Sequence, residues 1–145
     1  MSTRSRIAIE IGDKVKSIYC HSDGYPEGVG AILKKHYTDP EKIEKLMELG
    51  DLSRLGTFYD KKLAKMDWDK WSMEKEAREK LWAITNDMTV PYKDRGEDVP
   101  AREDSWDEFM GKLGCCGEEY TYIYHEDYSG VYRWEVCETP YFKEY

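Results

Sequence analysis

Residues 6–20, RIAIEIGDKVKSIYC, alternate between apolar and polar side chains on both sides of a Gly12-Asp13 turn. A period of two residues is typical of a half-buried strand, and Gly-Asp between two such runs is typical of a hairpin turn. The sequence therefore predicts an N-terminal β-hairpin with strands over 6–11 and 14–20. The apolar face of the first strand consists of Ile7, Ile9 and Ile11.

The same alternation returns near the other end of the chain, in residues 118–125 and 131–138, around a turn at 127–130. The pattern predicts a C-terminal hairpin. Because cross-strand aromatic pairs commonly stabilise sheets, we interpret its rings as core or oligomer interface, and a stacking platform is the alternative. These rings are Tyr120, Tyr122, Tyr124, Tyr132 and Trp134.

Four helices are expected between the hairpins. Asp39 and Pro40 have the residue types of an N-cap and a first helical position, and Gly50 is a suitable stop. Pro91 allows at most an edge strand within 86–94. We interpret 51–56 as a turn and 96–104 as a charged loop. The predicted helices cover 28–37, 40–49, 69–83 and 106–113, the last capped by Asp104 or Ser105 and closed by Gly114.

Hairpins at both ends with helices between them predict an α+β fold, with an antiparallel sheet of about four strands on which the helices pack. The length of 145 residues predicts a single domain over 1–145. Twelve Tyr and five Trp residues supply apolar area that the sparse aliphatic residues do not. We therefore expect a small, aromatic-rich core.

The chain is acidic, with 30 Asp plus Glu against 22 Lys plus Arg and a net charge of −8. Proteins that bind nucleic acid in bulk or membrane surfaces use a basic footprint, so we expect neither partner. A local basic pocket for a small anion remains compatible with this charge. No apolar run approaches the roughly 18 residues of a membrane helix, and no signal-peptide core is present, so a cytoplasmic location is expected.

Four cysteines, at 20, 115, 116 and 137, show no CxxC spacing. The sequence predicts neither a zinc site nor a disulfide framework. Cys115 and Cys116 are able to converge on a metal with His21 or His125, but buried reduced thiols are the preferred interpretation. We expect no metal and no cofactor.

No GxGxxG, Walker, HExxH, GxSxG or EF-hand pattern is present. His21 with Asp23 resembles an oriented general base, but no nucleophile stands at a suitable spacing. In a strand that ends at Cys20, the thiol points away from the side chain of residue 21. We therefore predict no catalytic residue and no enzyme, and interpret the many carboxylates as a solvated surface.

Residues 19–30, YCHSDGYPEGVG, combine stacking rings, polar tips and three glycines. Such a loop before a helix is able to hold an anion or a base edge through His21, Asp23 and Tyr25. The alternative is a plain connection in which Gly24 supplies a positive φ and Tyr25 fills the core.

Residues 92–97, YKDRGE, place a ring and two cations in one loop. Tyr92 and Arg95 have the chemistry to stack a base and hold a phosphate. In the alternative, Arg95 pairs with Asp94, Glu97 or Asp98 on the surface. Arg4 is likewise either a cation that holds a phosphate or a surface residue paired with a carboxylate.

Four segments resemble a family of small proteins of tailed bacteriophages and prophages: STRSRIAIE (2–10), IYCHSDGYPEGVGAILKKHY (18–37), GDLSRLG (50–56) and TVPYKDRGE (89–97). The resemblance covers most of the first 100 residues. Members often carry Trp at the position of Ser22 and Ala at that of Pro91. No role that needs a ring is therefore carried over to position 22.

That family is similar to the viral sponge proteins that sequester cyclic-nucleotide signals of bacterial CBASS defence. The resemblance implies a homo-oligomer, such as a tetramer, in the cytoplasm of the infected host, which binds a cyclic dinucleotide without cleaving it. It implies cations for phosphates, rings for bases, and Asp23 or Ser5 at a base edge or ribose hydroxyl. The implied ligand-binding residues are Arg4, Ser5, His21, Asp23, Tyr25, Tyr92 and Arg95.

Two other functions stay open. An acidic phage protein is able to mimic DNA and occupy a restriction or CRISPR enzyme, which requires carboxylates along one extended face. A nucleotide phosphodiesterase requires turnover that is lost in His21→Ala while binding is retained.

Overall fold

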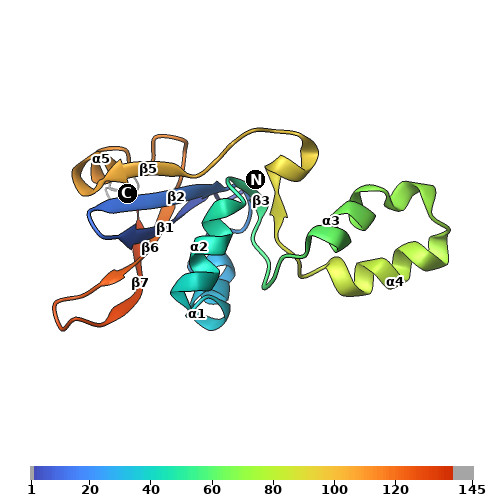
Figure 1. Ribbon diagram of the computed structural model, residues 1–145, viewed down its shortest axis with the longest axis horizontal. Helices are drawn as coiled ribbons and strands as arrows, with labels where there is room; N and C mark the ends of the chain where they lie inside the picture. Colours follow the sequence, from blue (N-terminus) through green and yellow to red (C-terminus); the bar gives the residue numbers. More distant parts are fainter. Residues whose placement is uncertain (1, 139–145) are drawn as a thin grey trace.

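The computed structural model describes residues 2–138 and shows an α+β protein built on one mixed sheet (Figure 1). The strand order is β4-β3-β2-β1-β6-β7, and β5 pairs with β2 beside this path. The α+β class is confirmed. The prediction of an antiparallel sheet of about four strands is wrong. The sheet has seven strands and two parallel pairs, β1 with β6 and β2 with β3. The strands are β1 (Ser5–Ile11), β2 (Lys14–Cys20), β3 (Leu52–Arg54), β4 (Val90–Pro91), β5 (Arg102–Ser105), β6 (Tyr120–Glu126) and β7 (Tyr132–Glu138).

Both predicted hairpins are confirmed. β1 and β2 are antiparallel from Ser5 opposite Cys20 to Ile11 opposite Lys14, around Gly12 with a φ of 60°. β6 and β7 pair antiparallel along their whole length. The hairpins join where β1 runs parallel to β6, an arrangement that requires a long connection between the two strands.

Helices account for most of the connection between the hairpins. The helix predicted over 40–49 is confirmed as α2, where the Asp39 side chain accepts from the backbone N–H of Glu41 at 3.0 Å. Ser105 forms a capping box with Glu108 at the start of α5. Of the two predicted caps, Asp104 and Ser105, the second is therefore confirmed. The helices are a short π-helix at Pro26–Gly30, α1 (Ala31–His36), α2 (Pro40–Glu48), α3 (Lys61–Trp68), α4 (Lys75–Thr85), α5 (Trp106–Gly111), and 3-10 turns at Lys70–Ser72 and Tyr92–Arg95.

The segment from 61 to 85 corrects a prediction. In place of one helix over 69–83, the structure has α3 and α4 joined by a short turn, and this helical pair projects from one end of the sheet (Figure 1). None of the α3 side chains is buried, and α4 buries Leu81 and Thr85. The few apolar residues of this segment therefore form a pair of helices that makes little contact with the core.

Three short strands lie where turns, loops or at most an edge strand were expected. β3 pairs with the end of β2 through Leu52 and Cys20, and β4 pairs with β3. β5 has the sequence REDS, which carries no apolar alternation, and it pairs with the first half of β2. Its buried Asp104 is held by Arg102 and Lys112, each at 2.6 Å. Ion pairs and backbone pairing therefore take the place of an apolar pattern in β5.

The sheet has two covered faces. α1 and α2 pack on the face that contains Ile7 and Ile18. α5 packs on the other face, where Phe109 contacts Ala8, Val15 and Ile123. Tyr122 and Tyr124 belong to the first of these clusters, so the interpretation of hairpin rings as core holds for both. Within residues 2–138, no helix combines the length and the apolar character that crossing a bilayer demands.

Candidate functional site

The face of the β1–β2 hairpin opposite α1 and α2 carries polar and charged side chains toward its open end. The register places Arg6 opposite Tyr19. Residues that face each other across an antiparallel pair share a face, and every second residue returns to it. Continuing the register by one pair therefore adds Arg4 and His21 to the face of Arg6 and Tyr19.

Tyr19 and His21 form the middle of this site. The Tyr19 hydroxyl lies 2.8 Å from Nδ1 of His21, and the backbone N–H of His21 donates to the Leu52 carbonyl at 3.0 Å. Burial raises the pKa of Tyr19, Arg4 lowers it and Tyr92 raises it, with a net rise.

The 3-10 turn Tyr92–Arg95 supplies a ring with a cation above it. The Arg95 guanidinium carbon lies 5.5 Å from the centroid of the Tyr92 ring, and Nη2 lies 3.4 Å from the Ser53 hydroxyl. Gly96 closes the turn with a φ of 85°. The pairing of Arg95 with Asp94 is not found, because both carboxylate oxygens of Asp94 accept from the Tyr59 hydroxyl, at 2.9 and 3.1 Å.

Arg4 and Arg95 are both exposed, and in the described part of the chain neither forms an ion pair with a carboxylate within 4.0 Å. Arg4 instead directs Nη1 at the Cys116 carbonyl, 3.4 Å away. An exposed guanidinium group without a carboxylate partner keeps its bidentate donors available for an external anion.

Asp51 joins the two halves of the site. Its Oδ1 accepts from the backbone N–H of Tyr19 at 2.9 Å, and its carbonyl accepts from the backbone N–H of Tyr92 at 3.1 Å. Burial raises the pKa of Asp51, and this effect exceeds the opposing contributions of the Tyr19 N–H and Arg6. Asp51 thereby positions the Tyr92 turn beside β2. No sequence motif marked Asp51, because its role depends on contacts with residues 32 and 41 positions away.

Three further predicted ligand residues lie elsewhere. Ser5 is fully buried on the face that packs against α1 and α2, opposite Cys20, so its placement at a ligand is wrong for this conformation. The hydroxyl of Tyr25 lies 3.3 Å from Oδ1 of Asp23, and both side chains are exposed. No described hydrogen bond or ring contact joins this pair to the Tyr19 group.

The loop 19–30 corrects two details of its structural interpretation. The positive φ belongs to Asp23, at 55°, whereas Gly24 is required for close packing, since a Cβ there would lie 2.7 Å from Cβ of Ser5. Tyr25 is 39% exposed and does not fill the core. The core ring at this loop is Tyr122, whose hydroxyl donates to the Gly24 carbonyl at 2.7 Å.

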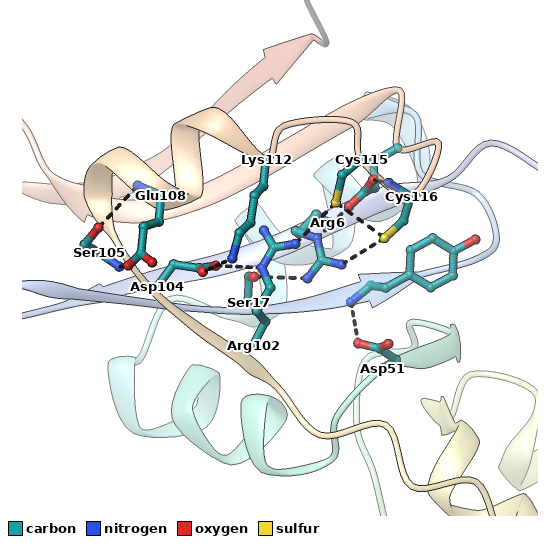
Figure 2. Close-up of polar contacts among 12 residues, drawn as sticks. Arg6, Ser17, Asp51, Arg102, Asp104, Ser105, Glu108, Lys112, Cys115 and Cys116 are labelled. Carbon is teal, nitrogen blue, oxygen red and sulfur yellow. Dashed lines mark hydrogen bonds and ion pairs between the residues drawn. The ribbon is translucent and has the colours of Figure 1, made fainter.

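A second cluster lies beside Arg4, where the loop after α5 returns to β1 (Figure 2). Arg6 donates through Nε to Glu118 at 2.6 Å, and the sulfurs of Cys115 and Cys116 are 3.5 Å apart. Both thiols are exposed, so the interpretation of these cysteines as buried is wrong, although Cys20 is buried. The convergence of the two thiols with His21 or His125 is not found among the described residues.

The cluster of Cys115, Cys116 and Glu118 brings three potential metal-binding atoms within 4.8 Å of one another. The charges around it oppose a cation. Glu118 is already paired with Arg6, and the guanidinium groups of Arg102 and Arg6 approach the two sulfurs at 3.4 and 4.0 Å. These guanidinium groups disfavour a further positive ion at the cluster.

Comparisons with protein-family models, with curated proteins and with solved structures give no match for this chain. Its function is therefore inferred from the chemistry of the two clusters.

Proposed function

We propose that the face formed by Arg4, Tyr19, His21, Tyr92 and Arg95 binds a cyclic dinucleotide or a related cyclic nucleotide signal and sequesters it without cleavage. The observation that carries this proposal is the pair of exposed guanidinium groups without carboxylate partners, one of them above a tyrosine ring. This arrangement matches a ligand that combines phosphates with flat bases.

The local charge balance supports an anionic ligand despite the net charge of −8. Three carboxylates in or beside the segments of this face already have partners. Asp94 accepts from Tyr59, Asp51 accepts from the Tyr19 N–H, and Glu118 accepts from Arg6. The cations of the face therefore remain available for phosphate, whereas the acidic remainder of the surface disfavours a long polyanion.

Binding without cleavage is supported by how the polar groups of the site are used. The Nδ1 atom of His21 is engaged by the Tyr19 hydroxyl, and no described contact joins this imidazole to an orienting carboxylate. Cys20 is buried on the other face, and burial raises the pKa of its thiol to about 11. A general base and a nucleophile are therefore not arranged toward a common point.

The wider proposal follows the resemblance given above. In it, the protein is a phage immune-evasion protein that acts as a homo-oligomer, such as a tetramer, in the cytoplasm of the infected host. Exposed apolar side chains of the C-terminal hairpin, Val131, Tyr132 and Val136, offer surface for contacts between subunits.

The test is a thermal-shift screen of the purified protein against cyclic dinucleotides, cyclic trinucleotides and cyclic ADP-ribose isomers. A ligand present at 100 times its Kd adds about 2.7 kcal/mol to the stability of the folded protein, which raises the Tm by several degrees. The ligand is then recovered and chromatographed. Stabilisation with return of the intact ligand is expected.

Charge-matched variants assign the site. Arg4→Gln and Arg95→Gln are expected to weaken binding by about tenfold each, because a charge-assisted hydrogen bond contributes roughly 1.5–3 kcal/mol. Lys34→Gln, on α1 across the sheet, removes the same charge and should leave affinity unchanged.

Other outcomes contradict the proposal. Recovery of an altered nucleotide would identify a phosphodiesterase, and His21→Ala would then be tested for loss of turnover. The absence of any shift would remove nucleotide ligands from consideration and direct the search to a host restriction or CRISPR enzyme, as the DNA-mimic alternative predicts.

A further inference from the structure

Cys115 and Cys116 form an exposed pair of neighbouring thiols with a defined arrangement. Their sulfurs lie 3.5 Å apart in the turn between α5 and β6. Two glycines with positive φ flank the pair, Gly114 at 76° and Gly117 at 83°. A compact turn therefore presents the pair at the surface with its two sulfurs in non-bonded contact.

Two arginines approach this pair of thiols (Figure 2), and each is also paired with a carboxylate, Arg102 with Asp104 and Arg6 with Glu118. Nη1 of Arg102 lies 3.4 Å from the Cys115 sulfur, and Nη2 of Arg6 lies 4.0 Å from the Cys116 sulfur. The other terminal nitrogen of Arg102, Nη2, is buried without a hydrogen-bond partner. The thiolate is the nucleophile in sulfur chemistry, and the Nη1 donor of Arg102 points at the Cys115 sulfur.

We propose that Cys115 and Cys116 are a thiol–disulfide exchange site whose reaction partner is a small disulfide that carries carboxylates, such as oxidised glutathione. The carboxylates of such a molecule complement Arg4, which is exposed and reaches the carbonyl of Cys116 with Nη1 at 3.4 Å. The thiols lie outside the proposed nucleotide site, although both proposals use Arg4, and thiol counting tests the sulfur chemistry separately from nucleotide binding.

The reaction balances in two steps. The Cys115 thiolate attacks one sulfur of oxidised glutathione, forms a mixed disulfide and releases one glutathione thiolate, which takes up the proton lost by Cys115. The Cys116 thiolate then attacks the Cys115 sulfur, forms the Cys115–Cys116 disulfide and releases the second glutathione thiolate. The protein dithiol is oxidised by two electrons, and one glutathione disulfide is reduced to two thiols.

The contacts assign different roles to the two cysteines. Cys115 has the closer guanidinium group, at 3.4 Å, so it is the attacking residue. Burial and the neighbouring Cys115 and Glu118 raise the pKa of the Cys116 thiol, which fits a residue that reacts second.

The experiment incubates the whole protein with oxidised glutathione at pH 7, counts free thiols over time and locates modified peptides by mass. The wild-type protein is expected to lose two thiols and to gain the Cys115–Cys116 disulfide within one chain. Cys116→Ser should stop at a glutathione adduct on Cys115. Cys115→Ser should react about tenfold more slowly. Cys137→Ser is the matched control and should behave as the wild type.

A second pair of variants tests the role of Arg102. Arg102→Gln is expected to slow the first step by about tenfold, and Arg102→Lys, which keeps the charge, to restore most of the rate. The melting temperature of each variant shows whether it is folded. The proposal is overturned if Cys115→Ser reacts at the wild-type rate, if glutathione attaches first to Cys137, or if Cys115 of the folded protein reacts no faster than in the urea-unfolded chain.

Discussion

Arg6 and Glu118 form a buried ion pair in which Nε of the arginine lies 2.6 Å from Oε2 of the glutamate, across 112 positions of sequence. Glu118 also accepts from the backbone N–H of Cys116 at 2.7 Å, and the neighbouring N–H of Glu119 donates to the Arg4 carbonyl. These contacts fix the chain at the point where it enters β6. The parallel pairing of β1 with β6 therefore begins at this ion pair.

Glu118→Ala is expected to lower the free energy of unfolding by about 3–5 kcal/mol, because it leaves the Arg6 guanidinium buried without its charge partner. Urea denaturation at pH 7 measures the change. Glu126→Ala, an exposed glutamate at the end of β6, is the control and should change stability by less than about 0.5 kcal/mol. Equal effects of the two substitutions would contradict a structural role of the pair.

The stability contributed by Glu118 should depend on pH. Burial raises the pKa of Glu118, whereas the hydrogen bond and the charge of Arg6 lower it. The lowering effects together are larger, so the pKa in the folded state lies below the usual value. A carboxyl group of this kind stabilises the fold fully above its unfolded pKa of about 4.3, and the contribution disappears as the pH falls through the folded value. The stability difference between wild type and Glu118→Gln should therefore shrink on acidification below about pH 4. A difference that is constant between pH 7 and pH 3 would disprove this linkage.

Gly24→Ala and Gly111→Ala should act in opposite directions. A Cβ at Gly24 would lie 2.8 Å from the Thr3 carbonyl oxygen and 2.9 Å from the Arg4 carbonyl carbon, so we expect a loss of about 1–3 kcal/mol. A Cβ at Gly111 meets no atom within 4 Å and lies in α5, where Ala is favoured by roughly 0.5 kcal/mol. Thermal unfolding of the two variants provides the measurement, and a stable Gly24→Ala protein would contradict the close packing.

The helical pair α3 and α4 should open locally before the sheet unfolds. Segments with few buried side chains exchange their amide hydrogens through low-energy openings, and α3 buries none of its side chains. Hydrogen exchange followed by mass spectrometry should show faster exchange in 61–85 than in β1 and β2. Equal protection of both regions would show that the helices are as stable as the sheet.

Tyr92→Ala should weaken binding of any nucleotide that the screen identifies by about tenfold or more, because stacking of a base on an aromatic ring contributes roughly 1–3 kcal/mol. Tyr92→Phe keeps the ring and should retain most of the affinity. Calorimetric titration of both variants separates these effects. Loss of binding in Tyr92→Phe would assign the interaction to the hydroxyl instead of the ring.

Part of the candidate site was predictable from local sequence. Tyr92 and Arg95 stand three residues apart in one turn, so their contact needs no distant partner. The prediction of Ser5 as a ligand residue is wrong because the predicted strand began at residue 6. The alternation of Ile7 and Ile9, extended back by two residues, puts the Ser5 side chain on the core face. Asp51 was missed because its two hydrogen bonds join β2 to the Tyr92–Arg95 turn, and these segments come together only in the folded protein.

The sequence by itself determined both hairpins, the Asp39 and Ser105 caps and the α+β class, because alternation, turns and caps depend on residues only a few positions apart. Only the tertiary structure decided the parallel pairing of β1 with β6, the strand β5 without apolar alternation, and the position of the Cys115–Cys116 pair beside Arg6 and Arg102. These features depend on backbone pairing and ion pairs between residues that are distant in the chain, and such contacts leave no periodic pattern in either segment alone.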